Sequence, residues 1–446
     1  MPTWVEHAIF WQVYPLGFVG ADTRPERPAP IAHRLGRLFG WLDYAIELGA
    51  SGLMLGPIFA SATHGYDTID HFRIDPRLGD DADFDALIAA ARKRGLRVVL
   101  DGVFNHVSRR HPAFEEVLAQ GRSAPPASWF RLSWPPGRET AERPEAATFE
   151  GHRELVLLNH ESPEVEKLVA DVMIHWLDRG AAGWRLDAAY AVPPRFWARV
   201  LPRVREKHPG AYLFGEVIHG DYVGFVKESG VDAVTQYELW KAIWSALNDR
   251  NFFELAWALD RHNALLDTFV PQTFVGNHDV TRLASRLEDP RCIDHALAVL
   301  FACGGTPSIY AGDEQAFRGV KEDRIGGDDA VRPAFPDAPE ALSPAGLPVF
   351  RRHQELIGMR RRHAWLHRAR TRVLHLANEA FAFEAFDGDR RLLVALNLGR
   401  QAELPAPGMR AILFGRDAAL RPDPREPRVR LGEAGWAIMS PAAGPL

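Results

Sequence analysis

Eight short apolar runs alternate with longer helical patterns along most of this 446-residue chain. Each run is followed by a segment in which apolar residues recur with the period of a helix. The runs lie at residues 9–15, 51–58, 96–104, 183–189, 211–217, 231–239, 272–279 and 306–314. Such alternation is typical of a parallel sheet, and eight repeats favour a closed (β/α)₈ barrel over an open doubly wound sheet. The predicted fold class is therefore α/β, with a TIM barrel at its centre.

Two parts of the chain depart from this alternation. Residues 107–158 contain proline pairs, a Trp-Phe pair and mixed charge, and they predict an inserted domain B after the third strand. Residues 364–446 contain short strand-like runs without helices, with a hairpin signal at 387–390, and predict a C-terminal antiparallel β-sandwich. The catalytic barrel is then expected to consist of residues 1–106 and 159–363.

Composition excludes several classes of protein. No run approaches the ~20 apolar residues that span a bilayer, and the N-terminal segment does not resemble a secretory signal. We therefore expect a cytoplasmic protein without a membrane partner. The net charge of −5, with arginines scattered over the whole length, gives no basic stripe for nucleic acid. Cys292 and Cys303 are expected to be reduced core residues.

Three carboxylates stand at the ends of three apolar runs. They are Asp187 in GWRLDAA, Glu216 in LFGEV and Asp279 in FVGNHD. Because parallel barrel strands end on one face, these side chains are expected to converge on one pocket. Carboxylates are costly to bury unless their charge is paired or used, and a pair about 5–5.5 Å apart serves retaining glycosidases. The sequence therefore predicts a retaining glycosidase.

Four ordered motifs carry a resemblance to a known family. DGVFNH (101–106), GWRLDAA (183–189), GEV (215–217) and FVGNHD (274–279) resemble the signature regions of the α-amylase superfamily, glycoside hydrolase family 13. The resemblance implies the barrel, the inserted domain B and the C-terminal β-sandwich. LNHESPEV (158–165) resembles the neopullulanase, cyclomaltodextrinase and oligo-1,6-glucosidase groups, but no N-terminal starch-binding module is expected here.

The resemblance assigns catalytic roles to the three acids. It implies that Asp187 is the nucleophile, that Glu216 is the general acid/base, and that Asp279 binds sugar hydroxyls in the transition state. Arg185 lies two residues before Asp187 on the same strand face and is expected to keep that carboxyl group ionised. Glu216 must carry a proton, and we expect a less compensated environment for it.

The resemblance also implies a set of substrate-binding residues. His106 and His278 match the two histidines on either side of the reacting sugar, and Tyr66 offers that sugar an aromatic face. Asp67 resembles an acid that pairs with an arginine behind a terminal sugar, and Arg332 is the expected partner.

Asp101 and Asn105 are expected to support the site. Asn105 resembles a calcium ligand of many α-amylases, but one amide oxygen cannot make a site that needs 6–8 oxygen ligands. Residues 107–158 show no matching acidic cluster. The sequence therefore predicts no metal site and no required cofactor, and it does not favour a structural calcium ion.

The leading hypothesis is a retaining hydrolase of short or cyclic malto-oligosaccharides, with α-1,4 links and, as a second option, α-1,6 links. A glucosyl or maltosyl transferase stays open, because it shares the covalent intermediate. Ile218 stands where related members carry an aromatic residue, which leaves the leaving-group preference open. A non-catalytic carbohydrate- or partner-binding barrel predicts loss of the acids, and all three are present. The expected partner is a small oligosaccharide, with a homodimer as a further option.

Overall fold

Eight parallel strands close into a barrel. A computed structural model of the chain describes residues 1–25, 29–134, 144–421 and 427–442. The barrel strands are β1 (Phe10–Val13), β2 (Gly52–Leu55), β5 (Arg97–Gly102), β10 (Gly183–Leu186), β11 (Tyr212–Gly215), β12 (Ala233–Val234), β13 (Gln272–Thr273) and β14 (Thr306–Tyr310). They pair in sequence order, and β14 returns to pair with β1. A parallel bridge between Thr235 and Gln272 closes the remaining gap, so the predicted barrel is confirmed.

The register of the barrel strands places charged residues beside one another. On β10, Arg185 is aligned with Asp101 of β5 on one side and with Phe214 of β11 on the other. Barrel strands are covered on both faces, which explains why their sequences read as nearly continuous apolar runs. A charged residue in such a strand must therefore find its partners inside the barrel.

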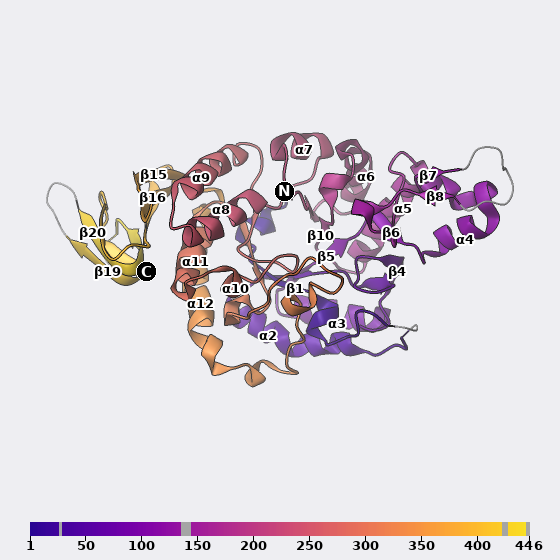
Figure 1. The fold of residues 1–446 in the computed structure, drawn as a ribbon, viewed down its shortest axis with the longest axis horizontal. Coiled ribbons are helices and arrows are strands. Elements are labelled where there is room, and N and C mark those ends of the chain that lie inside the picture. The colour runs from indigo at the N-terminus through magenta and orange to yellow at the C-terminus, as the bar shows by residue number, and fades with distance from the viewer. Residues whose placement is uncertain (26–28, 135–143, 422–426, 443–446) are drawn as a thin grey trace.

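Helices surround the barrel, as Figure 1 shows. They are α1 (Pro15–Phe18), α2 (Phe39–Leu48), α3 (Asp81–Lys93), α5 (Pro163–Asp178), α6 (Pro194–Lys207), α7 (Tyr222–Ser229), α8 (Tyr237–Asn248), α9 (Phe253–Leu265), α10 (Leu283–Arg286), α11 (Ile293–Ala302) and α12 (Leu347–Arg362). Local signals fix their starts: Asp80 and Asp83 form a capping box on α3, while α5 and α6 begin at proline.

The chain between β5 and α5 forms a small outlying unit. Its elements are β6 (His106–Ser108), α4 (Pro112–Gln120), β7 (Leu132–Ser133), β8 (Glu145–Ala146) and β9 (Leu155–Leu157). Strands β6 and β9 pair antiparallel at its base, and Phe114 and Phe130 pack edge to face inside it. A hairpin of β3 (Phe59–Ser61) and β4 (Thr68–Ile74) lies before it in the chain. The limits predicted for domain B, 107 and 158, fall within or beside β6 and β9 and stay a prediction.

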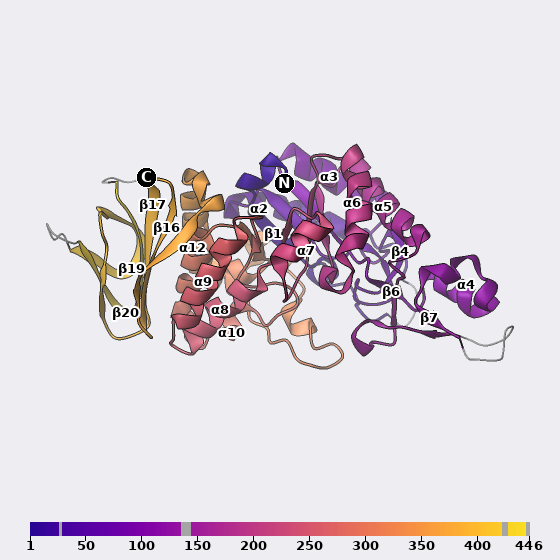
Figure 2. The same ribbon diagram turned by 90° about the horizontal axis from the view of Figure 1, so that it is seen from above.

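Among the described residues of the C-terminal part there are six antiparallel strands: β15 (Arg370–Leu376), β16 (Ala380–Asp387), β17 (Arg390–Asn397), β18 (Ala402–Pro405), β19 (Ala411–Arg421) and β20 (Arg428–Ser440). The long strand β20 pairs with β17 near its end, with β18 near its start, and with β19 along its length. The sheet folds over so that β18 contacts β15 and β16 around a separate apolar core. Figures 1 and 2 place this sheet and the outlying unit with α4 at opposite ends of the molecule.

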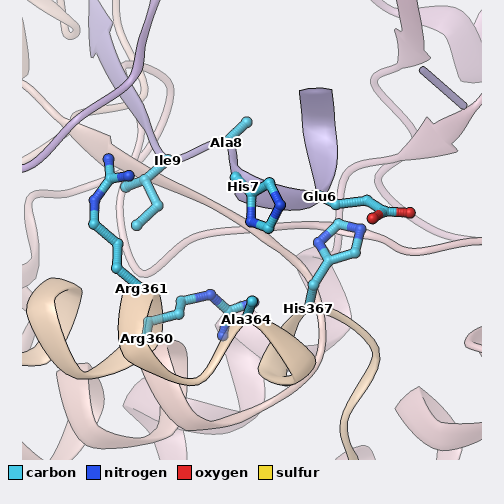
Figure 3. A pocket seen from close by; sticks show the side chains of 8 residues that line it. All are labelled: Glu6, His7, Ala8, Ile9, Arg360, Arg361, Ala364 and His367. Carbon is cyan, nitrogen blue, oxygen red and sulfur yellow. The ribbon is translucent and has the colours of Figure 1, made fainter. Parts of the chain in front are cut away.

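The end of the barrel opposite the strand carboxyl ends holds a buried arginine. The Arg-Arg-Arg run at 360–362 indicates a solvated helix face, but Arg360 is only 6% exposed. Its guanidinium group donates to the carbonyl oxygens of Phe301 (3.0 Å) and Cys303 (2.8 Å) and to that of Gly305. Figure 3 shows Arg360 and His367 at the small cavity there. The interpretation of a solvated face is therefore wrong for Arg360, because the end of α11 needs donors for its last carbonyl groups.

Both cysteines are buried and unpaired, as predicted. Burial raises the pKa of each thiol to about 11, which makes both side chains poor nucleophiles. Within the described ranges, no helix combines the length and the apolar character that crossing a bilayer requires.

Candidate active site

Four carboxylates surround one guanidinium group at the carboxyl end of the barrel. Arg185 Nη1 lies 2.7 Å from Asp101 Oδ1 and 3.2 Å from Asp187 Oδ1. Its Nη2 atom lies 2.7 Å from Glu216 Oε1 and 3.8 Å from Asp279 Oδ2. The residues come from β5, from β10 and the turn after it, from the end of β11, and from the segment after β13. The structure therefore brings the three predicted acids together around Arg185.

A second arginine completes the cluster. Arg332 Nη2 lies 2.7 Å from Asp279 Oδ1 and 3.2 Å from Asp328, and its Nε atom donates to the carbonyl oxygen of His278 at 3.0 Å. Burial alone would raise the pKa of Asp279, but His278, Arg332 and Arg185 together hold that pKa well below its usual value. Asp279 is therefore ionised at neutral pH.

Asp187 has the opposite electrostatic environment. Burial and the neighbouring carboxylate of Glu216 raise the pKa of Asp187 well above its usual value, against the effect of Arg185. Burial also raises the pKa of Asp101 to about 6. The expectation that Arg185 keeps Asp187 ionised does not hold, because Arg185 makes shorter contacts with Asp101 and Glu216. Two guanidinium groups cannot balance four carboxylates, which favours a proton shared within the cluster.

Glu216 accepts two hydrogen bonds and forms an ion pair. The Tyr237 hydroxyl group and the backbone N–H of Ala188 each donate to it at 3.0 Å, and Arg185 Nη2 lies 2.7 Å from its Oε1 atom. Ala188 follows Asp187 and has left-handed backbone angles, φ 43° and ψ 37°, a strained conformation that proteins keep mainly at functional sites. Glu216 is therefore not the less compensated carboxylate that the sequence analysis expected.

Sequence reasoning missed Tyr237 and the backbone of Ala188. Tyr237 begins α8, three residues after the end of β12, and its hydroxyl group also accepts a hydrogen bond from Asn277 Nδ2 at 2.9 Å. The position of Tyr237 after a barrel strand is a signal that could have identified it, since barrel enzymes place site residues there. The backbone angles of Ala188 leave no signal in the sequence.

Tyr66 and His278 meet inside the site. The Tyr66 hydroxyl group is hydrogen-bonded to His278 Nε2 and lies 3.1 Å from Asp101 Oδ2, while Gln12 Nε2 lies 3.1 Å from His278 Nδ1. Burial lowers the pKa of His278 to about 3, so the imidazole is neutral. Asp101 thus contacts Arg185 and Tyr66, which fits the supporting role predicted for it.

Both ring nitrogens of His106 form hydrogen bonds within the protein. Nε2 donates to the carbonyl oxygen of Tyr66 at 2.9 Å, and Nδ1 accepts from the Asn105 amide at 3.2 Å. Burial lowers the pKa of His106 to about 4, and Phe149 stacks on the ring with 4.7 Å between centroids. His106 lies beside Tyr66 as predicted, but this geometry leaves no ring nitrogen to donate to a sugar.

The predicted pairing of Asp67 with Arg332 is wrong. Asp67 accepts hydrogen bonds from the backbone N–H (3.0 Å) and the hydroxyl group of Thr63. Across the described part of the chain, no ion pair joins Asp67 to Arg332, which turns instead to Asp279 and Asp328. Both residues nevertheless line one cavity of about 700 Å³, within the size range of small-molecule sites.

Asn105 is not part of a metal-binding cluster in the described residues. Its buried amide contacts His106, and the one grouping of three His, Cys, Asp or Glu ligand atoms is His33, Asp80 and Asp83. In that grouping, the two carboxylates form the capping box of α3. The residues around Asn105 therefore do not fit the oxygen-rich shell of calcium, and the expectation that no metal is needed stays a prediction.

The fold and the carboxylate cluster together define a barrel glycosidase of the α/β class. Comparison with known proteins makes this specific: residues 12–369 match the alpha amylase catalytic domain family, and the chain belongs to this family.

Individual relatives cover most of the chain. It is 30% identical over 433 residues to a cyclomaltodextrinase from Geobacillus thermopakistaniensis, covering 91% of this chain and 71% of that protein. It is 30% identical over 344 residues to an intracellular maltogenic amylase from Bacillus subtilis, covering 72% of this chain and 57% of that protein. Against the solved structure of a cyclic α-maltosyl-(1→6)-maltose hydrolase from Arthrobacter globiformis, the TM-score is 0.81 at 27% identity, covering 98% of this chain and 99% of that chain.

Proposed function

We propose that this protein hydrolyses short or cyclic malto-oligosaccharides with net retention, at α-1,4 links and, as a second option, at α-1,6 links. One observation carries the proposal: Asp187 and Glu216 contact the same guanidinium group of Arg185 at the carboxyl end of the barrel. This shared contact brings the two carboxyl groups close together, as a retaining mechanism requires. The names of the relatives, a cyclomaltodextrinase and a hydrolase of a cyclic maltosyl-maltose, support the substrate class.

The proposed reaction has two steps. In the first, Asp187 attacks the anomeric carbon, the bond to the leaving oxygen breaks, and that oxygen takes a proton from Glu216. In the second, Glu216 removes a proton from water, and the oxygen of that water displaces Asp187 from the anomeric carbon. The attack requires Asp187 as a carboxylate and Glu216 as the acid, so the proton favoured on Asp187 in the free protein must pass to Glu216 before the first step. Ionised Asp279 accepts hydrogen bonds from sugar hydroxyl groups.

A product time course tests this function. Wild type should cleave maltotriose, pullulan or a cyclodextrin, and NMR of the first product should show the α-anomer. Glu216→Gln should lose this activity, while Glu161→Gln, which changes a surface ion pair with Arg195, should keep it. Longer products instead of hydrolysis would favour the transferase. Absence of turnover on every α-glucan, or turnover unaffected by Glu216→Gln, would contradict the proposal.

Location, assembly and metal independence belong to the same proposal. The name of the Bacillus subtilis relative, an intracellular enzyme, supports a cytoplasmic location. We expect activity to survive exhaustive treatment with a metal chelator, since the residues around Asn105 do not form a calcium shell. A homodimer remains a prediction, which light scattering of the purified protein would test.

A further inference from the structure

A small cavity lies at the end of the barrel opposite the carboxylate cluster. It has a volume of about 90 Å³ and is formed by the segment before β1, the last turn of α12 and the 3₁₀ turn Ala364–Arg368. Figure 3 shows the side chains of Arg360, Arg361, His7 and His367 around it. The cavity is larger than the ~30 Å³ of one water molecule but smaller than the ~300 Å³ or more of most organic ligand sites. Its size therefore suits a small ion and excludes a sugar.

The buried charge of Arg360 has no ionic partner at this cavity. Its guanidinium group donates to the carbonyl oxygens of Phe301, Cys303, Gly305 and Leu366. Among the described residues, no carboxylate pairs with Arg360 or offsets the burial that lowers its pKa to about 10. Carbonyl dipoles solvate a cation without neutralising it, and a buried charge that is not neutralised is costly. In the same part of the chain, the Nε–H of Arg360 has no acceptor and is free to bind a ligand.

Arg361 and His367 add donors to the same cavity. Arg361 donates to the carbonyl oxygen of Gly49, and no carboxylate in the described ranges pairs with it. His367 is 5% exposed, and its Nε2 atom is buried without a hydrogen-bond partner in the described chain. Burial and the charge of Arg360 lower the pKa of His367 to about 3, so the ring is neutral. In the tautomer that carries the proton on Nε2, this ring offers one more unused donor.

One carboxylate reaches the rim of the cavity. Glu6 Oε1 lies 3.9 Å from Arg368 Nη2, and the side chain of Glu6 is 43% exposed. Solvent screens an exposed pair of this kind, so Glu6 does little to balance the buried charge of Arg360. The lining of the cavity therefore carries more positive than negative charge.

We infer that this cavity binds a small inorganic anion, such as chloride or phosphate. The anion accepts hydrogen bonds from Arg360 Nε and His367 Nε2 and lies near the charge of Arg361. It gives the buried guanidinium group a counter-charge that the chain itself does not supply. The inference is independent of the proposed glycosidase function, because the cavity lies at the opposite end of the barrel. Its effect is on stability, since a ligand that binds only the folded protein raises the free energy of unfolding.

Thermal unfolding at constant ionic strength tests the inference. Sodium gluconate, whose anion is too large for the cavity, is replaced stepwise by sodium chloride or sodium phosphate, so that general screening stays the same. For wild type, we expect a saturating rise in melting temperature of about 3 °C with at least one of these two anions. Crystals soaked in bromide should show an anomalous scattering peak between Arg360 and His367.

Two variants and a matched control locate the binding. Arg361→Gln removes a charge beside the cavity, and His367→Leu removes the unpartnered nitrogen, so both should lose most of the rise. In gluconate, His367→Leu should be at least as stable as wild type, because it removes a buried polar atom without a partner. Arg362→Gln alters the next residue of α12, which does not line the cavity, and should keep the full rise.

The outcomes distinguish this inference from its alternatives. A rise confined to chloride or to phosphate would support the inference and identify the anion. A melting temperature that depends on ionic strength alone would overturn it. An equal rise in wild type, Arg361→Gln and His367→Leu would overturn it as well, because the anion would then bind elsewhere. Turnover of maltotriose well below the unfolding temperature should not change with the anion, and a complete lack of turnover would contradict the proposed function alone.

Discussion

At the scale of single residues, the charge balance around Arg185 governs the chemistry of the site. Four carboxylates share two guanidinium groups, which favours protonation of at least one carboxyl group. The effect differs between the acids: the pKa of Asp279, which lies between two arginines, is lowered, and the pKa of Asp187 is raised. Separating the pKa values of neighbouring acids is the device by which carboxylates acquire different catalytic roles.

Replacement of Asp187 by Asn tests the role of the nucleophile. We expect kcat/KM on a malto-oligosaccharide to fall by at least about 10⁴-fold, as when an essential catalytic group is removed. The melting temperature should stay equal or rise, because one of the crowded carboxylates becomes neutral. Steady-state kinetics and thermal unfolding measure the two effects, with Asp171→Asn as a surface control. A loss of less than about tenfold would exclude Asp187 as the nucleophile.

Glu314 makes stability depend on pH. This fully buried side chain accepts hydrogen bonds from the Tyr44 hydroxyl group (2.8 Å) and the Gly312 N–H (2.9 Å), and burial raises its pKa to about 7. Between the usual pKa of 4.5 and about 7, the folded protein holds a proton that the unfolded chain releases. The free energy of unfolding therefore falls as pH rises through this window.

Glu314→Gln should remove this dependence. Its stability relative to wild type should increase by about 3 kcal/mol between pH 4.5 and pH 8, as the pKa shift implies. Urea unfolding at the two pH values measures the difference. A constant difference between the two proteins across this range would show that Glu314 does not titrate with folding.

At the scale of elements, the ends of helices and strands decide which polar residues are buried. Arg360 is the clearest case: it lies in an arginine run on α12, yet it supplies donors to the carbonyl groups between the end of α11 and the start of β14. The helical period of α12 could be predicted from the sequence. The burial of Arg360 could not be predicted, because the carbonyl groups that accept its hydrogen bonds lie more than fifty residues away in the chain.

Arg360→Met should destabilise the protein by about 3 kcal/mol or more, because it leaves buried carbonyl groups without donors. Arg362→Met, on the exposed part of the same helix, should change stability by less than about 0.5 kcal/mol. Activity per folded molecule should stay unchanged in both, since this end of the barrel lies opposite the site. Equal unfolding free energies for the two variants would contradict the role given to Arg360.

At the scale of the whole molecule, burial of many neutral histidines makes the fold sensitive to acid. Burial lowers the pKa of eight histidines to about 3 or 4: His106, His111, His160, His262, His278, His295, His353 and His367. Below the usual pKa of 6.5, the unfolded chain takes up protons at these positions and the folded chain does not. Stability is therefore lost as pH falls from about 6.5 towards 4, against the smaller opposite effects of Asp101, Asp313 and Glu314.

We expect cooperative unfolding in this range, with the uptake of several protons near pH 5. Each histidine contributes up to about 1.4 kcal/mol per pH unit. His353→Gln, far from the site, should reduce the proton uptake by nearly one. The pH dependence of urea unfolding measures this number. A stability that stays constant from pH 6.5 to pH 4.5 would contradict the conclusion that the buried histidines stay neutral in the folded protein.

The barrel could be predicted from sequence alone, because eight apolar runs alternating with helical periods are local patterns. Asp187, Glu216 and Asp279 could be predicted as well, since residues that end barrel strands must meet on one face. The partners of these side chains come from the folding of distant segments: Arg332 pairs with Asp279 and not with Asp67. Hydrogen bonds between distant segments depend on distances and backbone angles that no local pattern encodes, and these contacts decide which carboxylate carries the proton.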